Sequence, residues 1–439
     1  MKNAVIGIRR EDKNIWEKRV PLVPGDVGKL VKEFGLPVVV QPSMNHRAFE
    51  DEAYRVQGAE IREDLSDCDI ILGVKEIPPD AFQDNTTYVF FSHVIKGQKY
   101  NMPMLKQLLK RKCTLIDYEK IEDSSGRRLI FFGRYAGLAG MVETLHAYGQ
   151  RLQAEGVVSP FAEIKQPRDY PSLTAIKDAV RRVGEAIARD GLPKEIQPVV
   201  CGFTGYGNVS RGAQEIYDLL PVREISPEDL ERGGDTSHNP MREVYKVVFH
   251  EKHMFEPRDA TVTFDLQHYF RNPGKYRSRF DRFTNELTLL VNCIFWTEEC
   301  PRLVTRDAVH RMYTGPVPPR LKVIGDISCD IEGSMEVTVR ATDIEHPTFV
   351  YEAASGKPIT GVSGNGPVIM AIENLPCEIP VEASEDFSRV LVEFLPELAG
   401  CDMSAGWEAL DLMYELKHAV IAYHGELTPQ YAYIAGFLK

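Results

Sequence analysis

The sequence predicts an α/β protein with two open, mostly parallel sheets that are covered by helices. Short apolar runs alternate with helical stretches through residues 1–135, and a second strand–turn–helix unit begins near residue 197. No run of about 18 apolar residues is present, so no membrane-spanning helix and no membrane partner are expected. With 439 residues, the chain is long enough for two or three domains of about 100–200 residues each.

The N-terminal part alternates strands and helices, which is typical of a parallel sheet with helical crossovers. The apolar runs are short and are separated by amphipathic or turn-forming segments. The predicted strands cover residues 4–8, 38–40, 70–74, 88–92 and 114–117, and the predicted helices cover 24–33 and 104–112.

The rest of the chain repeats this alternation less regularly. A longer helix is expected at 137–155, where apolar residues recur at helical spacing, and a polar, proline-containing stretch follows at 159–173. The second α/β unit should run from residue 197 to about 331, with strands at 198–203, 244–248, 260–264 and 321–327. A strand at 348–351, a glycine-rich turn at 361–366 and helices at 385–395 and 403–421 complete the prediction.

Composition excludes some function classes. The formal net charge of -12 argues against a nucleic-acid partner, which would need a basic face. An anionic substrate must therefore be met by local positive charge. None of the eight cysteines forms a CxxC pair, which favours free thiols in a reducing compartment and gives no indication of a metal. The N-terminus becomes charged before an apolar signal core could form, so a cytoplasmic location is expected.

The strongest motif is a glycine-rich loop between an apolar strand and an amphipathic helix. It contains Gly205 and Gly207, with Ser210 at the place of a third glycine and Asn208 and Val209 at the start of the helix. Gly205 can form the tight turn, Gly207 lets backbone N–H groups approach a pyrophosphate, and the helix N-terminus favours an anion. The pattern predicts dinucleotide binding, and an ordinary glycine turn is the alternative.

The type of nucleotide is not fixed by this loop. An acidic residue at the end of the next strand would hold the ribose 2′-OH of NAD, and a basic residue would accept the 2′-phosphate of NADP. The segment after the helix carries one of each, Arg223 and Glu224. Both are candidate cofactor residues.

Charged side chains follow the first predicted strands of the N-terminal part. Arg10 and Arg19 come after the first strand, Lys75 ends the strand at 70–74, and His93 follows the strand at 88–92. Ligands of open α/β sheets bind at the carboxyl ends of the strands, so these residues should line one edge. An arginine there can bind a carboxylate. A partly desolvated lysine and a histidine can exchange protons near neutral pH. Solvated surface charge and structural ion pairs are the alternatives.

Two acidic residues occupy similar positions on other strands. Glu119 follows the strand at 114–117, and Asp330 follows the strand at 321–327. Either could tune the charge of a site, or it could simply cap a turn.

These segments together resemble the alanine dehydrogenase superfamily, and more narrowly the lysine–2-oxoglutarate reductase domain of aminoadipic semialdehyde synthases and the lysine-forming saccharopine dehydrogenases. The resemblance covers nearly the whole chain. It rests on residues 9–11, 16–22, 71–75, 91–96, 115–119, 136–141, 203–214, 301–306, 345–347, 374–376 and 382–387.

The resemblance implies two Rossmann-like, doubly wound domains with a cleft between them. The first is a discontinuous substrate domain, expected at residues 1–137 plus 345–439. The second is the dinucleotide-binding domain, expected at residues 138–344.

The resemblance also implies a reaction. L-Lysine condenses with 2-oxoglutarate, and NADPH reduces the imine to saccharopine; NADH is also possible. Lys75 and His93 match the family's acid–base pair, and Glu119 matches an acidic residue that tunes it. Arg19, with Arg10 nearby, matches the group that meets a substrate carboxylate. Asp330 matches an acidic residue near the nicotinamide.

Two alternatives remain at this point. One is an NAD-dependent, lysine-forming saccharopine dehydrogenase, and the other is a non-catalytic nucleotide-binding relative. In larger members the domain is fused to a saccharopine dehydrogenase domain, which this chain lacks. It would therefore be monofunctional, or a part of a bifunctional mitochondrial matrix enzyme.

Overall fold

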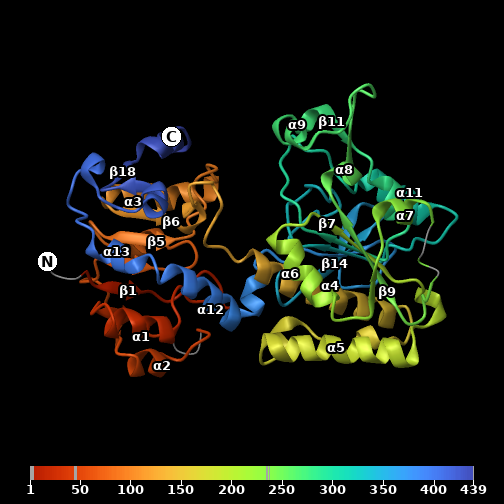
Figure 1. Ribbon diagram of the computed structural model, residues 1–439, viewed down its shortest axis with the longest axis horizontal. Helices are drawn as coiled ribbons and strands as arrows, with labels where there is room; N and C mark the ends of the chain where they lie inside the picture. Colours follow the sequence, from red (N-terminus) through yellow and green to blue (C-terminus); the bar gives the residue numbers. More distant parts are fainter. Residues whose placement is uncertain (1–3, 44–46, 234–235, 237, 439) are drawn as a thin grey trace. The chain divides into compact units, whose positions relative to one another are not determined.

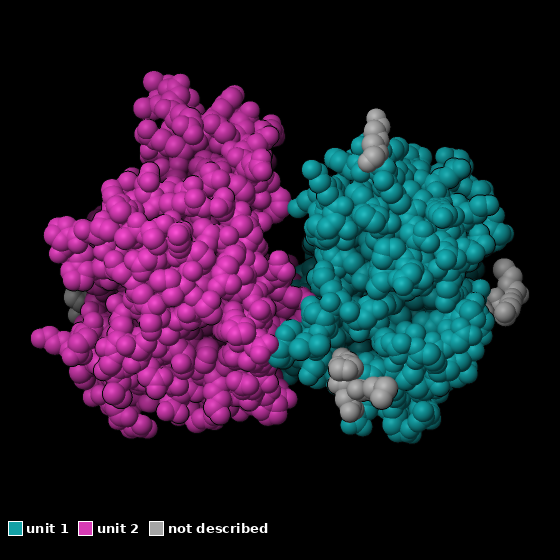
Figure 2. Space-filling view, turned by 180° about the vertical axis from the view of Figure 1, so that it is seen from behind, with its two compact units in different colours: residues 1–132, 380–439 teal, residues 133–379 magenta. Residues whose placement is uncertain are grey.

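A computed structural model describes residues 4–43, 47–233, 236 and 238–438. The chain divides into two compact units, which Figure 2 colours separately. Unit 1 comprises residues 1–132 and 380–439, and unit 2 comprises residues 133–379. The first unit is therefore discontinuous, as expected. The return to unit 1 comes at residue 380 rather than near 345, because three strands between these positions extend the second sheet.

The sheet of unit 1 has eight strands in the order β18-β17-β6-β5-β4-β1-β2-β3 (Figure 1). The parallel part contains β1 Ile6–Ile8, β2 Val38–Val40, β3 Glu60–Ile61, β4 Ile70–Leu72, β5 Thr87–Phe90 and β6 Thr114–Asp117. Except in β3, every strand residue is buried. Strands buried on both faces appear in sequence as continuous apolar runs, which is why most of them were predictable.

Helices connect the strands of unit 1. They are α1 Pro24–Lys32, α2 Asp51–Val56 and α3 Met102–Lys110, followed near the C-terminus by α12 Pro380–Leu391, α13 Leu395–Gly400 and α14 Tyr414–His418. The predictions of α1, α3 and α12 are confirmed to within a few residues, except that α12 begins five residues earlier than expected.

The helix predicted at 403–421 is wrong. Only Tyr414–His418 is α-helical, and the chain then forms β17 Val420–Tyr423 and β18 Glu426–Leu427. β17 pairs antiparallel with β6 and so extends the sheet. Its run of apolar residues is too short to distinguish a buried strand from the end of a helix by periodicity alone.

Unit 2 contains a second eight-stranded sheet in the order β15-β14-β16-β13-β12-β7-β9-β8. Its strands are β7 Val200–Thr204, β8 Val222–Glu224, β9 Val244–Phe249, β12 Leu289–Asn292, β13 Val323–Asp326, β14 Thr348–Glu352, β15 Lys357–Thr360 and β16 Val368–Met370. The six strands from β16 to β8 pair in parallel, and β14 and β15 add an antiparallel edge.

Two helices of unit 2, at 133–154 and 208–217, were predicted, and the long helix at 173–190 was not. The helices of this unit are α4 Gly133–Ala154, α5 Leu173–Asp190, α6 Asn208–Tyr217, α7 Pro227–Glu231, α8 Glu251–Met254, α9 Leu266–Arg271, α10 Asp281–Thr284 and α11 Arg306–Thr314. The sequence signals of α5 are clear in retrospect. The Ser172 side chain accepts a hydrogen bond from the Ala175 N–H, and Gly191 ends the helix at φ 87°.

The strand predicted at 260–264 is also wrong. This segment is irregular and mostly exposed, and it lies between the hairpin strand β10 Phe255–Pro257 and α9. β10 pairs instead with β11 Tyr276–Ser278. The alternation of valine and threonine fits a half-buried strand, but none of the strands that the structure describes pairs with this segment to bury one side of it.

Two glycines let α4 and α6 approach closely. A Cβ atom on Gly137 would lie 1.9 Å from the carbonyl oxygen of Val209, and one on Gly212 would lie 2.1 Å from that of Arg134. Figure 1 shows the two helices side by side. Gly212, two residues after Ser210, therefore allows the close approach of the two helices.

Gly212→Ala should destabilise unit 2 by about 2 kcal/mol, because the added methyl overlaps a backbone atom that cannot rotate away. Gly274→Ala is the matched control, since its nearest neighbour would lie at 3.9 Å. Urea unfolding followed by circular dichroism measures both changes. Equal stability of the two variants would contradict this packing.

Candidate functional site

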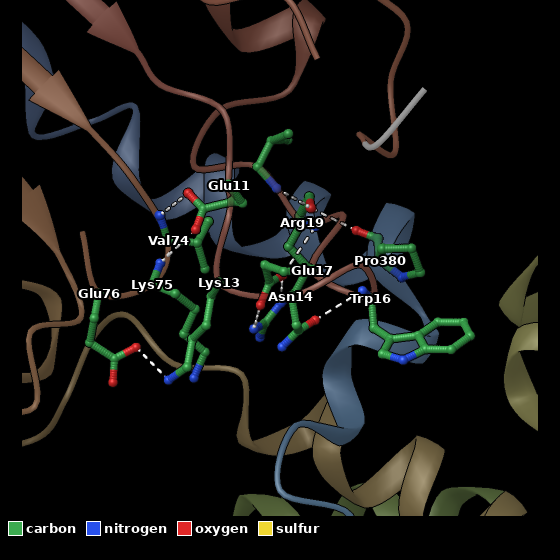
Figure 3. Close-up of polar contacts among 12 residues, drawn as sticks. Glu11, Lys13, Asn14, Trp16, Glu17, Arg19, Val74, Lys75, Glu76 and Pro380 are labelled. Atoms are coloured by element: carbon green, nitrogen blue, oxygen red, sulfur yellow. Dashed lines mark hydrogen bonds and ion pairs between the residues drawn. The ribbon is translucent and has the colours of Figure 1, made fainter. Parts of the chain in front are cut away.

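The strand order of unit 1 places a ligand-binding edge beside β1 and β4. The strand order is β3-β2-β1-β4-β5-β6. After β1, the chain adds β2 and β3 on one side of this strand and then β4, β5 and β6 on its other side, so the order reverses between β1 and β4. Parallel sheets bind ligands outside the carboxyl ends of the strands at such a reversal. Figure 3 shows the residues that follow β1 and β4 at this place.

Glu11 connects the ends of these two strands. Its carboxylate accepts hydrogen bonds from the backbone N–H groups of Val74, at 2.7 Å, and Lys75, at 3.0 Å. Burial raises the pKa of Glu11 to about 7, against the opposing charge of Arg9. A side chain of the β1 loop thus holds the backbone that carries a candidate catalytic residue.

Lys75 is desolvated and close to other cations. Burial lowers the pKa of its ammonium, and the charges of Arg19 and Lys13 lower it further. Among the residues that the structure describes, this ammonium has no hydrogen-bond or ion-pair partner. Both conditions favour the neutral amine, which is the form that acts as a base.

His93 lies in an ion pair that sequence analysis did not predict. Its Nδ1 is 2.7 Å from Oε1 of Glu76, and the other carboxylate oxygen of Glu76 binds Lys13 at 2.7 Å. Burial alone would raise the pKa of Glu76, but these two partners hold it well below its usual value. Glu76 directly follows Lys75, so the pair places His93 beside the lysine segment.

The backbone of His93 is also unusual. His93 is in the left-handed region at φ 48°, where a non-glycine residue is uncommon and often marks a functional site. The Asn101 side-chain amide donates to the carbonyl oxygens of Ser92 and His93, at 3.0 and 3.3 Å, and supports this conformation. The imidazole ring also stacks on Phe91, with centroids 6.1 Å apart.

Asp117 connects the ends of β5 and β6. One carboxylate oxygen accepts from the backbone N–H and the hydroxyl of Ser92, and the other accepts from the Glu119 N–H at 2.8 Å. Asp117 is fully buried, and burial raises its pKa. Glu119 therefore lies at the same edge as His93, and its carboxylate is 3.9 Å from Arg128.

The two predicted substrate arginines are already paired. Glu17 holds Nε and one terminal nitrogen of Arg19 at 2.8 and 2.6 Å, and both side chains are buried. The Arg19 guanidinium also lies over the Phe132 ring, 4.2 Å from its centroid. Arg10 is more exposed and binds Glu63 through two nitrogens, on the β2–β3 side of the sheet.

The glycine loop of unit 2 has the geometry that a pyrophosphate needs. Gly205 has φ 83° and donates its N–H to the Phe249 carbonyl at 3.0 Å. Gly207 is the N-cap of α6, and among the described residues, apart from its two chain neighbours, no atom would lie within 4 Å of a Cβ placed there. Asn208 and Val209 form the first turn of α6, whose N–H groups can bind an anion. Gly205 and Gly207 line a cavity of about 590 Å³.

The structure places Arg223 and Glu224 away from this loop. β8, which carries them, pairs with β9 and not with β7, and Glu224 lies opposite Lys246 near the start of β9. The neighbour of β7 on that side is β9, which ends at Phe249. The residues that follow it, His250 and Glu251, occupy the position that sequence analysis gave to Arg223 and Glu224.

Contacts around the cavity support this position for His250 and Glu251. The His250 ring stacks on Tyr206 of the glycine loop, with centroids 4.3 Å apart, and Glu251 lines the cavity. The order of the strands along the chain does not reveal this position, because β8 follows β7 in sequence although β9 is the strand that lies beside β7. A sequence pattern alone gives no signal for such an exchange.

Asp330 lies in the turn after β13, where a buried network fixes the backbone. Within this network Asp326 accepts from the Asn292 amide at 2.8 Å, the Thr338 hydroxyl at 2.6 Å and the Cys329 N–H at 3.2 Å. Burial raises the pKa of Asp326 to about 6. Asp330 thus occupies the carboxyl edge of the second sheet, as predicted, and Asp326 and Asn292 hold the turn.

Three observations concern other kinds of site. All eight cysteines are free thiols. No helix in the described part of the chain combines the length and the apolar character needed to cross a membrane. Within the same residues, no group of three or more histidine, cysteine, aspartate or glutamate side chains could hold a metal ion.

Asp326 should make stability depend on pH. A folded-state pKa of about 6, against 3.8 in the unfolded chain, means that ionisation costs stability as pH rises from 4 to 6. The resulting decrease in the free energy of unfolding approaches about 3 kcal/mol above pH 6. In Asp326→Asn this contribution is absent, so its free energy of unfolding relative to the wild type should rise by that amount between pH 4 and pH 7. A constant difference across this range would contradict the assignment.

Comparisons with known proteins agree with this architecture. The model of the alanine dehydrogenase/PNT N-terminal domain matches residues 7–139, and that of the C-terminal domain matches residues 277–430. Among solved structures, an L-alanine dehydrogenase superposes over 99% of this chain and 100% of its own, with a TM-score of 0.62 and 18% identity. A transhydrogenase from Sinorhizobium meliloti superposes over 97% and 99%, with a TM-score of 0.53 and 15% identity.

Curated relatives are more similar in sequence. An alpha-aminoadipic semialdehyde synthase from Arabidopsis thaliana is 39% identical over 100% of this chain and 42% of its own length, and the mitochondrial enzyme from Mus musculus is 37% identical over 98% and 47%. The chain thus spans about half the length of these relatives. A saccharopine dehydrogenase [NAD(+), L-lysine-forming] from Neurospora crassa is 26% identical over 96% and 98%.

The two domain models match well over half of the chain in the expected order, and both sheets have the corresponding fold. The protein belongs to the alanine dehydrogenase/PNT family of nicotinamide-nucleotide-dependent dehydrogenases.

Proposed function

We propose that this protein condenses L-lysine with 2-oxoglutarate and reduces the product with NADPH to saccharopine. The observation that carries the proposal is the group formed by Lys75, with its lowered pKa, and the His93–Glu76 pair at the strand reversal of unit 1. The similarity to alpha-aminoadipic semialdehyde synthases over the whole chain indicates the substrates.

The chemistry needs one base and one acid. The ε-ammonium group of lysine must lose a proton, because only the neutral amine nitrogen can form a bond to the ketone carbon of 2-oxoglutarate. The resulting carbinolamine then loses its hydroxyl as water, which requires a proton. Loss of water leaves a C=N bond, and a hydride added to its carbon reduces it to a single bond, so that saccharopine, water and the oxidised nucleotide are the products. When bound, the nicotinamide ring supplies that hydride.

Lys75 and His93 can carry these protons. Neutral Lys75 takes the proton of the substrate ammonium, and its lowered pKa makes the neutral form more accessible than it is in a solvent-exposed lysine. His93 then protonates the leaving hydroxyl. Glu76 holds the imidazole through Nδ1, which orients Nε2 for the transfer. Glu119 adds a negative charge at the same strand edge.

Arg19 and Arg10 face the carboxylates of the substrates in this scheme. Glu17 neutralises Arg19 and holds it in place, so a substrate carboxylate must share the guanidinium with Glu17. Arg10 must likewise share its guanidinium with Glu63. The pairing with Glu17 thus weakens the net attraction between Arg19 and a substrate carboxylate, but it fixes the direction of the Arg19 N–H donors.

The nucleotide is held by unit 2 in this proposal. The turn at Gly205, the open approach at Gly207 and the first N–H groups of α6 at Asn208 and Val209 bind the pyrophosphate. We assign Asp330, at the carboxyl edge of the same sheet, to the nicotinamide end of the nucleotide.

The nucleotide preference depends on the end of β9. His250 and Lys252 can attract the 2′-phosphate of NADPH, and they support our choice of this cofactor. Glu251 favours the alternative, NADH, because a carboxylate can bind a ribose 2′-OH and repels a phosphate. The NAD-dependent saccharopine dehydrogenase of Neurospora crassa is the corresponding relative. A non-catalytic relative is disfavoured because Lys75 and His93 are both present.

The cellular context follows from the same relatives. We propose a cytoplasmic location, or the mitochondrial matrix if the chain is part of a bifunctional enzyme, since one relative is described as mitochondrial. In that case a saccharopine dehydrogenase domain would be its covalent partner. Eight free thiols are compatible with either reducing compartment.

Lys75→Met and His93→Asn should each lower kcat for lysine-dependent NADPH oxidation by about 10²- to 10⁴-fold, the usual contribution of a general acid or base. NADPH affinity, measured by fluorescence, should stay within about twofold, because the glycine loop lies in the other unit. Lys110→Met, at an exposed position of α3, is the control. Unchanged turnover in both catalytic variants would exclude the proposed chemistry.

Glu251→Gln should raise the ratio of kcat/KM for NADPH to that for NADH by about tenfold, which corresponds to about 1.4 kcal/mol of removed repulsion. Glu224→Gln should leave this ratio unchanged. Steady-state kinetics with both nucleotides give the answer. A shift in Glu224→Gln alone would mean that β8, and not β9, forms the ribose site.

A further inference from the structure

The backbone of residues 74 and 75 lies beyond the regular pairing of β4. The Gly73 N–H still donates to the Val89 carbonyl of β5, at 3.1 Å. The next two N–H groups, of Val74 and Lys75, bond to the two carboxylate oxygens of Glu11. A single side chain therefore replaces the strand partner for the peptide that carries Lys75, as Figure 3 shows.

The surroundings of Glu11 are built for this contact. Gly73 lies beside the carboxylate, and a Cβ there would be in ordinary van der Waals contact with a Glu11 oxygen, at 3.5 Å. The charged and titratable groups that face Glu11 come from several segments: Arg9 of the β1 end, Glu17 of the following loop, Arg47, and Tyr118 of the turn after β6. None of these supplies the two acceptor atoms that the N–H groups need.

We propose that Glu11 is a positioning residue for the reaction, whose carboxylate holds the Val74–Lys75 backbone and thereby fixes where the Lys75 amine lies. The inference rests on the proposed function only for the role of Lys75. Glu11 itself exchanges no proton with substrate. Two hydrogen bonds to an ionised acceptor are among the stronger restraints available to a loop.

The protonation state of Glu11 should matter for catalysis. The carboxylate form accepts both N–H groups, whereas the neutral acid presents one oxygen as a hydroxyl donor. Since burial raises the pKa of Glu11 to about 7, the two forms exchange near neutral pH. The segment is held best above pH 7 and loosens as the pH falls below it, so kcat should rise through this range. The charged groups that face this carboxylate are Arg9, Arg47 and Glu17, and Glu17 is buried in its pair with Arg19.

Glu11→Gln tests the role, because glutamine keeps the size but can accept from only one of the two N–H groups. We expect amide hydrogen exchange in peptides containing residues 73–76 to accelerate about tenfold, since a charged hydrogen bond is lost. We expect kcat to fall about 10- to 100-fold, as a misplaced group causes, and the ionisation near pH 7 to disappear from its pH profile. NADPH affinity and melting temperature control for folding.

Two further variants complete the test. Glu11→Asp should retain the ionisation and lose less activity, because it keeps both acceptor oxygens at a shorter reach. Glu33→Gln, at the exposed end of α1, should behave as wild type. Unchanged exchange at residues 73–76 in Glu11→Gln would overturn the proposal, and so would accelerated exchange with unchanged kcat and pH profile. The exchange result does not depend on turnover, so an inactive wild type would contradict the proposed function and not the Glu11 contact.

Discussion

Buried carboxylates that bind the ends of parallel strands determine the geometry of both candidate sites. A strand that ends at the carboxyl edge leaves backbone N–H groups without partners, and a buried unpaired N–H is costly. Buried carboxylates accept these N–H groups: Glu11 accepts from the segment after β4, Asp117 from the segment after β5, and Asp326 from the turn after β13. Each of these acids bonds to backbone next to a functional candidate: Lys75, His93 and Asp330. The elevated pKa values of the three acids are the electrostatic consequence of placing carboxylates there.

The same edge concentrates charges that the overall composition would not suggest. The chain carries a net charge of -12, yet Arg19 and Lys13 lie close enough to Lys75 to add to the lowering of its pKa by burial. Individual acids compensate the cations: Glu17 pairs with Arg19, and Glu76 bridges Lys13 and His93. Lys75 is left without such a partner among the described residues, and this asymmetry distinguishes it as the proposed base.

Sequence patterns predicted the parallel sheets and most of the strand ends, because continuous apolar runs and the glycine loop are local signals. They placed Lys75, His93, Glu119, Gly205, Gly207 and Asp330 at the carboxyl edges where the structure has them. They failed where the result depends on which strands become neighbours. β9 lies beside β7 although β8 precedes it, so Arg223 and Glu224 are displaced from the glycine loop. The return of the chain to unit 1 at residue 380 and the strand β17 depend on the same long-range pairing. The partners Glu17 and Glu76 were visible only as charged residues in loops.

Product analysis tests the central claim most directly. The protein is incubated with lysine labelled with ¹⁵N at the ε position, 2-oxoglutarate and NADPH carrying deuterium at the transferable position, and the product is examined by mass spectrometry. The account predicts one product with the mass of saccharopine that contains the ε-nitrogen of lysine and one deuterium on the carbon derived from the ketone. A deuterated amino acid that lacks the lysine nitrogen would show that the protein reduces a different imine and would contradict the account.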